Sequence, residues 1–431
     1  MKKLFCFLLA LWVFCGCTPN VQESQTSKEE AVQPIETIYT QDAAQLVNLI
    51  EDTHPCFMLE DIPEGYEEAK VVFLAEAARC KDDHTFQLAA MAYAASLKDG
   101  HTKIDSSSIM LSLYQLPWIY QDGKLWKTDD NGNRTDIEIF TIGGVAAEKL
   151  YACIDRYIVS ENASGQTRSY STYTKSRDIL AKAGVTITQE NNRNIIVIET
   201  SVGSEKVSVR PKEQQPYSPT PVVSYTWMTD VFYMDLNSCT PGVAVDAACE
   251  ELAAAVEDGL SKVILDLRGN GGGNSSVGKQ ILRAMKMQGP NYGSTIRLSY
   301  LALETYPQYA GWKNEKGLVE IQPDLSMAKV NPNIDLVVLT DMETYSSAKM
   351  LAVWVQDGKL GSVIGQPSCN KPSSYGDILR FTLEGTGFTG TVSHKRFLRP
   401  DASANPEIME LDLIVPEDED ALEAALTLLQ E

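Results

Sequence analysis

One stretch constrains the fold of this chain more than any other, because within a few residues it changes from strand to glycine-rich turn to helix. Residues 263–267 are almost continuously apolar, as in a strand buried on both faces of a parallel sheet. Gly269 and residues 271–273 follow, and residues 277–287 have the apolar spacing of a helix. A buried strand that leads into a helix in this way is typical of an α/β layer fold.

The glycines of this turn also indicate a binding function. Glycine lets backbone N–H groups approach a ligand closely, so the turn could bind a phosphate or a developing oxyanion. The sequence has neither the Gly-Lys-Ser/Thr ending of a phosphate-binding loop nor the G-x-G-x-x-G spacing of a dinucleotide site. At this point a tight turn with a purely structural role remains the alternative.

The strand–helix pattern continues through the second half of the chain, so we expect residues 216–431 to form one α/β core. Residues 211–222, rich in proline and polar side chains, mark its beginning. The other expected strands are 232–236, 336–339, 362–365, an antiparallel set within 376–398, and 411–415; the other expected helices are 244–257, 347–355 and 418–429.

The first half of the chain has a different pattern. Residues 39–105 have helical apolar spacing that stops at Gly100, and residues 106–215 contain short alternating strands. We expect hairpins at 118–126, with its turn at residues 121–123, and at 195–210, across Gly203; we expect helices at 146–161 and 170–183. The predicted fold class is therefore α/β in a multi-part, α+β arrangement: an N-terminal helical part, a small β-rich insert and the α/β core.

The N-terminus has the features of an export signal. Lys2 and Lys3 precede the apolar stretch Leu4–Phe14, which is too short to span a bilayer comfortably. The ending at residues 14–17 resembles a bacterial lipoprotein signal, so we expect residues 1–16 to be removed and Cys17 to carry lipid. Residues 17–38 then form a polar tether. The expected location is the cell envelope, with a membrane anchor on Cys17; an ordinary secretory signal cut nearby is the alternative.

Charge and cysteine spacing exclude several classes of function. The formal net charge is −21, and a nucleic-acid partner needs a basic surface, so we expect none. The cysteines beyond the signal have no C-x-x-C spacing, so no zinc or other metal site is expected. Nothing in the sequence implies an organic cofactor, and nothing predicts disulfide pairing or an oligomeric state.

Three further segments could carry chemistry, each with a simpler explanation. Ser346 lies where a buried strand leads into a helix, so helix N–H groups could stabilise an oxyanion there, although a plain capping serine is commoner. His101, in Asp99-Gly100-His101-Thr102, could act as a general base or be a structural histidine. Lys371 lies in a loop after a strand, where an exposed lysine is equally expected.

Taken together, these segments resemble the tail-specific, or C-terminal-processing, serine protease family, including its tricorn-core-like branch. The resemblance spans roughly residues 40–430. It depends on the order of "DGHT" at 99–102, "LDLRGNGGG" at 265–273, "TYSSA" at 344–348, "VIGQPSCNKPSSYGD" at 363–377 and the closing strand at 411–415 with its helix. It implies an α/β core similar to the crotonase-like superfamily. Residues 108–160 are similar to one end of a peptide-binding PDZ module.

The resemblance also implies roles for individual residues. Ser346 matches the nucleophile, and Gly271, Gly272 and the amide of Ser347 match the oxyanion-binding region. The family uses either a histidine or a lysine as base; we favour His101 over Lys371. Glu407, or less well Glu410, is the candidate for the orienting acid.

Two departures from the family pattern bear on these roles. Lys349 stands where glutamate is often found, and Leu411-Asp412 replaces a Pro-Asp pair. The predicted function is an exported serine endopeptidase that acts on peptides or proteins. The alternatives are a catalytically impaired lipoprotein that binds peptides or hydrophobic ligands, and an esterase. No G-x-S-x-G motif is present, which disfavours an α/β-hydrolase.

Overall fold

The computed structural model describes residues 37–105, 112–213, 218–312, 314–416 and 419–430. The expected signal peptide, Cys17 and most of the expected tether lie outside these residues. Helix α1 (Ile38–Thr53) begins at the last residue of that tether and is capped by Thr37. None of the helices in the described ranges combines the length and apolarity needed to cross a bilayer.

The helices expected between residues 39 and 98 are confirmed. They are α1, the short 3₁₀ turn η1 (Pro55–Phe57), α2 (Tyr66–Ala77) and α3 (Asp83–Ala95). Asp82 starts α3 by accepting the Thr85 amide at 2.8 Å. The three long helices bury aromatic side chains between them, with Phe73 stacked on Tyr93 at 4.7 Å between ring centroids. The end of α3 leads directly into the 99–102 motif.

An eight-stranded sheet occupies the middle of the chain, in the order β2-β9-β8-β5-β4-β3, with β6 and β7 paired at its sides. Both predicted hairpins are confirmed, and the turn residues Asp122 and Gly123 have φ of 53° and 80°, as tight hairpin turns require. The strands are β2 (Tyr114–Gln115), β3 (Trp118–Gln121), β4 (Lys124–Thr128), β5 (Arg134–Ile142), β6 (Val145–Ala146), β7 (Thr188–Glu190), β8 (Arg193–Thr200) and β9 (Gly203–Pro211).

The helices of this middle part differ from the prediction. The helix expected at 146–161 is α4 (Ala147–Asp155) and ends early, and the one expected at 170–183 is two helices, α5 (Ala163–Tyr173) and α6 (Arg177–Ala183). Side-chain caps explain the breaks, because Asn162 accepts the Gly165 amide and Ser176 accepts the Ile179 amide. A loop at 156–162 results, and it is important for the site.

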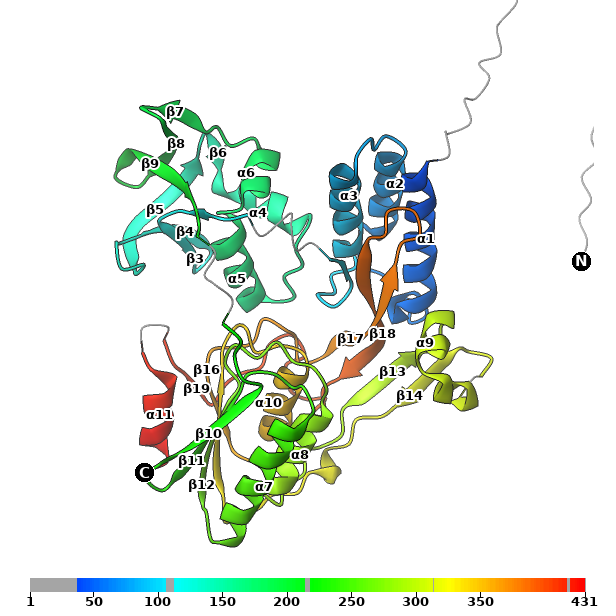
Figure 1. Cartoon of the computed structure of the whole chain (residues 1–431), viewed down its shortest axis with the longest axis vertical. Coiled ribbons are helices and arrows are strands. Elements are labelled where there is room, and N and C mark those ends of the chain that lie inside the picture. The colour runs from blue at the N-terminus through cyan, green and yellow to red at the C-terminus, as the bar shows by residue number, and fades with distance from the viewer. Residues whose placement is uncertain (1–36, 106–111, 214–217, 313, 417–418, 431) are drawn as a thin grey trace, which may run out of the picture. The chain divides into compact units, whose positions relative to one another are not determined.

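The predicted α/β layer is a six-stranded sheet in the order β10-β11-β12-β15-β16-β19, parallel except for β10. Val263 and Leu265 pack in one hydrophobic cluster with α7, α8 and α10, whereas Ile264 packs in another with α11. Helices therefore cover both faces of the sheet (Figure 1), as the apolar run predicted. The elements are β10 (Val223–Met228), β11 (Val231–Leu236), β12 (Lys262–Asp266), β15 (Asp335–Thr340), β16 (Ser362–Gly365), β19 (Leu413–Ile414), α7 (Val243–Glu257), α8 (Ser276–Ala284), α10 (Ser347–Asp357) and α11 (Ala421–Leu428).

A further, five-stranded sheet was not expected as a unit. Its order is β1-β18-β13-β14, with β17 paired to β18, and it shares its hydrophobic cluster with the N-terminal helices. Strand β1 pairs with β18 so that Lys103 lies opposite Thr391, which anchors the 99–102 motif beside this sheet. The elements are β1 (Lys103–Ile104), β13 (Gly293–Arg297), β14 (Leu318–Ile321), β17 (Ser374–Thr382) and β18 (Thr389–Leu398), with α9 (Tyr300–Thr305), η2 (Pro307–Trp312) and η3 (Leu325–Met327) between them.

Candidate active site

The glycine turn and the loop that carries Ser346 meet at one edge of the six-stranded sheet. Strands β12 and β15 pair in parallel, so the segments that follow them emerge side by side. Three hydrogen bonds fasten these segments to each other: the Gly269 amide to the Asp341 carboxylate (3.0 Å), the Thr344 hydroxyl to the Leu267 carbonyl (2.9 Å), and the Tyr345 amide to the Asn270 carbonyl (2.9 Å). The turn therefore has a fixed position relative to the serine.

Ser346 has a strained backbone, with φ of 52° and ψ of −120°. Residues with a side chain adopt such a conformation at a cost of roughly 1–3 kcal/mol, and it recurs at functional sites. A strained strand-to-helix turn presents the nucleophile in α/β-hydrolases in the same way. Its hydroxyl makes no capping bond to the described part of α10. The simple explanation of Ser346 as a helix cap is therefore not supported.

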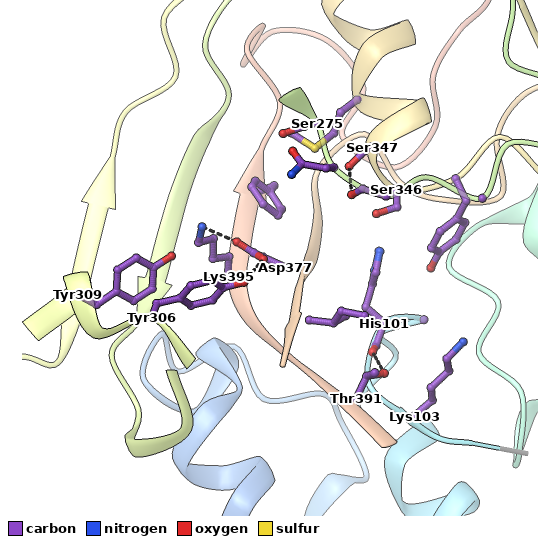
Figure 2. A pocket seen from close by; sticks show the side chains of 18 of the residues that line it. His101, Lys103, Ser275, Tyr306, Tyr309, Ser346, Ser347, Asp377, Thr391 and Lys395 are labelled. Atoms are coloured by element: carbon purple, nitrogen blue, oxygen red, sulfur yellow. Dashed lines mark hydrogen bonds and ion pairs between the residues drawn. The ribbon is translucent and has the colours of Figure 1, made fainter. Parts of the chain in front are cut away.

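Ser346 opens into a cavity of about 620 Å³ that is also lined by His101, Gly271 and Ser347. Figure 2 shows the His101 imidazole pointing toward Ser346. Four of the residues predicted from the sequence therefore share one cavity. On its far wall, an ion pair joins Lys395 to Asp377 at 2.5 Å.

Two backbone amides at this site are available to a ligand. The amides of Gly271 and Ser347 have no hydrogen-bond acceptor among the described residues. Gly272 differs from its predicted role, because its amide donates to Asn270 Oδ1 at 2.9 Å. Its importance is steric: with φ of 97°, a Cβ added there would lie 2.9 Å from the Ser347 nitrogen. Gly272 therefore leaves room for the Ser347 amide.

His101 is held by the segment around it. Its carbonyl accepts the Thr391 hydroxyl of β18 at 2.7 Å, and its ring lies 5.0 Å from that of Tyr345 between centroids. Its Nδ1 is 3.6 Å from Asp99 Oδ1, and neither ring nitrogen has a hydrogen-bond partner in the ranges that the structure covers. The ring is thus positioned between a carboxylate and the cavity.

Asp99 is the carboxylate behind His101, and it is fully buried. Several donors converge on it: the His101 amide (2.9 Å), the Thr102 hydroxyl (2.7 Å), the Ser393 hydroxyl (2.6 Å) and His54 Nε2 (3.3 Å). Burial alone would raise the pKa of Asp99, but its interactions with His101 and His54 hold that pKa well below its usual value. Asp99 therefore stays ionised and can orient an imidazole.

Lys371 and Glu407 lie elsewhere. The two side chains form an ion pair with each other and line a second cavity of about 540 Å³, which does not include Ser346. The Glu410 carbonyl accepts the Gln356 side chain. In this arrangement Glu407 does not orient His101, since Asp99 occupies that place.

Sequence reasoning missed three residues that the structure places at the centre of the site: Asp99, Glu161 and Asn370. Glu161, from the 156–162 loop, accepts from Gly100 and Tyr345, and Asn370 accepts the Ser346 amide at 3.0 Å. Asp99 could have been identified, because it lies two residues before His101 in the same motif. Glu161 has no such local signal, since its loop carries no recognisable motif.

Lys349 is a buried lysine one helical turn after Ser346. Its Nζ donates to the Pro372 carbonyl at 3.1 Å and lies 3.4 Å from the Ser374 hydroxyl, so it joins α10 to the start of β17 and to the loop before it. Burial lowers the pKa of Lys349 to about 7. Lys349, which departs from the family pattern, thus has a structural role: it links α10 to the segment around Pro372.

Asp99, His101 and Glu161 also form a group whose possible metal-ligand atoms lie within 4.8 Å of one another. Both carboxylates already accept several N–H and O–H donors from the protein. The oxygens of these carboxylates therefore already bind groups of the protein that hold the loops together, and the cluster does not indicate a metal centre.

The comparisons with known proteins agree with this description. Residues 230–404, which include the glycine turn and Ser346, match the model of peptidase family S41. Comparison with curated proteins gave no match. The solved structure of mature CPAF is similar at a TM-score of 0.54 and 13% identity, covering 88% of this chain and 93% of that one.

Two other solved structures give similar values. Mature CPAF complexed with lactacystin has a TM-score of 0.52 at 12% identity, covering 88% of this chain and 94% of that one. The photosystem II D1 C-terminal processing protease has a TM-score of 0.45 at 14% identity, with coverages of 92% and 98%. At these identities the CPAF matches show a shared fold.

The family match and the fold define a serine-type peptidase, a class whose substrates are peptides or proteins. Residues 230–404 thus resemble peptidase family S41, and the predicted resemblance to C-terminal-processing proteases is confirmed over that region.

Proposed function

We propose that the chain is a serine endopeptidase that works through an acyl-enzyme on Ser346, with His101 as general base and Asp99 as the residue that orients it. One observation carries the proposal: a strained serine and an imidazole whose nitrogens have no partner among the described residues face the same cavity. The amides of Gly271 and Ser347, which have no acceptor in the described part of the chain, line that cavity as well.

The positions of the donors suggest the state of His101. Asp99 Oδ1 faces Nδ1, which favours the tautomer with its proton on that nitrogen. Nε2 is then free to accept the proton of the Ser346 hydroxyl as the oxygen attacks the substrate carbonyl. The negative charge that develops on the carbonyl oxygen is stabilised by the Gly271 and Ser347 amides. One such donor is typically worth about 10²–10³ in rate.

The intermediate then collapses in the usual order for this chemistry. The carbon–nitrogen bond breaks, the amine takes the proton from His101 Nε2, and the acyl group stays on Ser346 as an ester. Water enters, loses a proton to Nε2 and attacks the ester carbonyl. Ser346 recovers its proton when it leaves, so the enzyme is regenerated.

A serine-directed phosphonate probe tests this proposal on the purified full chain. We expect covalent labelling at Ser346, loss of both labelling and peptide hydrolysis in Ser346→Ala, and normal labelling in Ser275→Ala. Ser275 lines the same cavity, so it is the matched control. Unchanged turnover in Ser346→Ala would refute the proposal. A wild-type chain that neither labels nor hydrolyses would favour the ligand-binding alternative, and turnover of esters alone would favour an esterase.

We also propose that the chain is exported and anchored through lipid on Cys17, because residues 14–17 have the pattern of a lipoprotein signal. In a bacterial host, the wild-type protein should enter the detergent phase in phase partitioning, and Cys17→Ser should move it to the aqueous phase. Cys15→Ser, two residues away, is the control and should behave as wild type. Partitioning that does not respond to Cys17→Ser would contradict a lipid anchor at that position.

A further inference from the structure

The Glu161 carboxylate joins segments that lie far apart in the sequence. Its Oε1 accepts the Gly100 amide at 3.1 Å and the Tyr345 hydroxyl at 2.8 Å. Its Oε2 accepts the Asn370 side-chain amide at 2.7 Å and the Lys371 backbone amide at 3.1 Å. The four donors come from the loop of His101, the loop of Ser346 and the loop between β16 and β17.

Asn370 extends this connection to Ser346 itself. The Ser346 amide can only donate, so the atom of Asn370 that faces it at 3.0 Å must be the carbonyl oxygen. The amide nitrogen of Asn370 then necessarily faces Glu161. One carboxylate thus fixes the orientation of a buried asparagine, and that asparagine holds the strained backbone of the serine in place.

Gly100 is closely packed against the Glu161 carboxylate and its partner Tyr345. A Cβ at Gly100 would lie 2.3 Å from the Tyr345 hydroxyl oxygen and 2.8 Å from Glu161 Oε1. The loop of His101 can therefore approach the carboxylate only because residue 100 is glycine.

Glu161 belongs neither to the N-terminal helices nor to the six-stranded sheet. It lies in the loop between α4 and α5, within the β-rich middle part of the chain. Two neighbours reach the same segments: Asn162 donates to the Ser368 carbonyl at 3.0 Å, and Arg168 pairs with Glu343. The middle part therefore contacts the loops on both sides of Ser346.

We propose that Glu161 is a positioning residue for the peptidase reaction, supplied by the middle part of the chain, which aligns the base loop with the nucleophile through Gly100, Tyr345 and Asn370. The inference rests on the proposed serine peptidase function. It assigns the middle part a role in completing the active site, in addition to any role in binding substrate.

A carboxylate is essential to this role, because the described groups that face its two oxygens are four donors. In Glu161→Gln the size is kept, but one oxygen becomes an NH₂ group. The Gln oxygen still serves Gly100 and Tyr345, while the NH₂ faces the donors of Asn370 and Lys371. Leaving such donors without acceptors should lower kcat by about 10- to 100-fold, with KM changed less than threefold.

The reciprocal change at Asn370 gives a rescue experiment. Asn370→Asp keeps an acceptor for the Ser346 amide but places a second carboxylate oxygen against Glu161, so activity should again fall by about 10- to 100-fold. In E161Q/N370D the Gln NH₂ group donates to the new carboxylate, so the contact is restored with the donor and acceptor exchanged. We expect the double variant to recover to within about tenfold of wild type.

The experiment measures kcat and KM for a peptide substrate, and amide hydrogen exchange of the peptide containing residues 341–350, in the full chain. The control is Glu148→Gln, the same change at an exposed position of α4; it should match wild type in both measurements. Faster exchange at residues 341–350 in E161Q, and its reversal in the double variant, are the results expected.

The outcomes separate this inference from the proposed function. An active wild type whose E161Q variant keeps full kcat and normal exchange would overturn the role of Glu161. The role of Glu161 would also be overturned if the kcat of E161Q/N370D fell by the product of the two single-variant losses, with no rescue. A wild type without peptidase activity would refute the proposed function, and in that case the exchange data alone would decide whether Glu161 positions the Ser346 loop.

Discussion

Gly272→Ala perturbs the proposed oxyanion site without removing any polar group. The residue has φ of 97°, which costs an alanine roughly 1–2 kcal/mol. Its new methyl group would lie 2.7 Å from Ser346 Cβ, 2.8 Å from the Tyr345 carbonyl oxygen and 2.9 Å from the Ser347 nitrogen. All three atoms are held by the backbone, so the strain cannot be relieved by rotating a flexible side chain.

The contact distances give the size of the effect. Ordinary contacts of a Cβ begin near 3.4 Å, so the Ser347 nitrogen has to retreat by about 0.5 Å. Oxyanion donors act at 2.7–3.1 Å, and losing one costs about 10²–10³ in kcat. We therefore expect Gly272→Ala to lower kcat by about 10²–10³ and the free energy of unfolding by about 2–3 kcal/mol.

Gly271→Ala is the matched control for stability, because its φ is ordinary and a Cβ there meets no atom within 4 Å. Its unfolding free energy should stay within about 1 kcal/mol of wild type. Peptide hydrolysis measures kcat, the rate of phosphonate labelling measures the reactivity of Ser346, and urea unfolding measures the free energy of unfolding. A Gly272→Ala variant that is less stable but keeps kcat within threefold would show that the Ser347 amide does not bind the oxyanion.

Two further predictions concern the lysines near the site. Lys371→Ala should leave kcat within about threefold of wild type if His101 is the base. An ion pair at the surface contributes roughly 0–1 kcal/mol, and the backbone amide of residue 371 keeps its hydrogen bond to Glu161. A loss of kcat above 100-fold would instead identify Lys371 as the base. Lys349 has an ordinary pKa of 10.5 when unfolded and about 7 when buried, so the unfolded chain binds more protons between these values and stability rises with pH in that window. Lys349→Met removes this dependence. Urea unfolding should therefore show that the free energy of unfolding of wild type rises by about 2 kcal/mol relative to that of the variant between pH 7 and pH 9. Parallel curves of unfolding free energy against pH for the two proteins would contradict the prediction.

The sequence predicted the local elements of this site better than its long-range connections. Three elements could be predicted because each has its own apolar period or turn chemistry: the strand at 263–267, the glycine turn and the helix after Ser346. The pairing of β1 with β18 was not, since two residues at 103–104 carry no periodic signal. That pairing sets the position of His101 relative to the Ser346 cavity.

The orienting acid illustrates the same limit. Similarity to a family pattern favoured Glu407, a residue late in the chain, whereas the geometry favours Asp99, which lies next to the histidine in sequence. Asp99 can be distinguished by the hydrogen-bond partners of its carboxylate. Thr102 belongs to the same motif, but Ser393 and His54 come from distant elements. A carboxylate that needs donors from three segments can be recognised only after those segments are assembled.

Asp99 and Glu161 are two carboxylates beside His101, and each accepts donors from several segments. Such groups leave unpaired donors behind when one segment moves, so they favour a single arrangement of the loops. Because Glu161 comes from the middle part, the strained conformation of Ser346 depends on contacts made by a region outside the S41 match at 230–404. It follows that residues 230–404 alone would keep Ser346 and the glycine turn but lack His101, the proposed base, and Glu161, the proposed positioning residue.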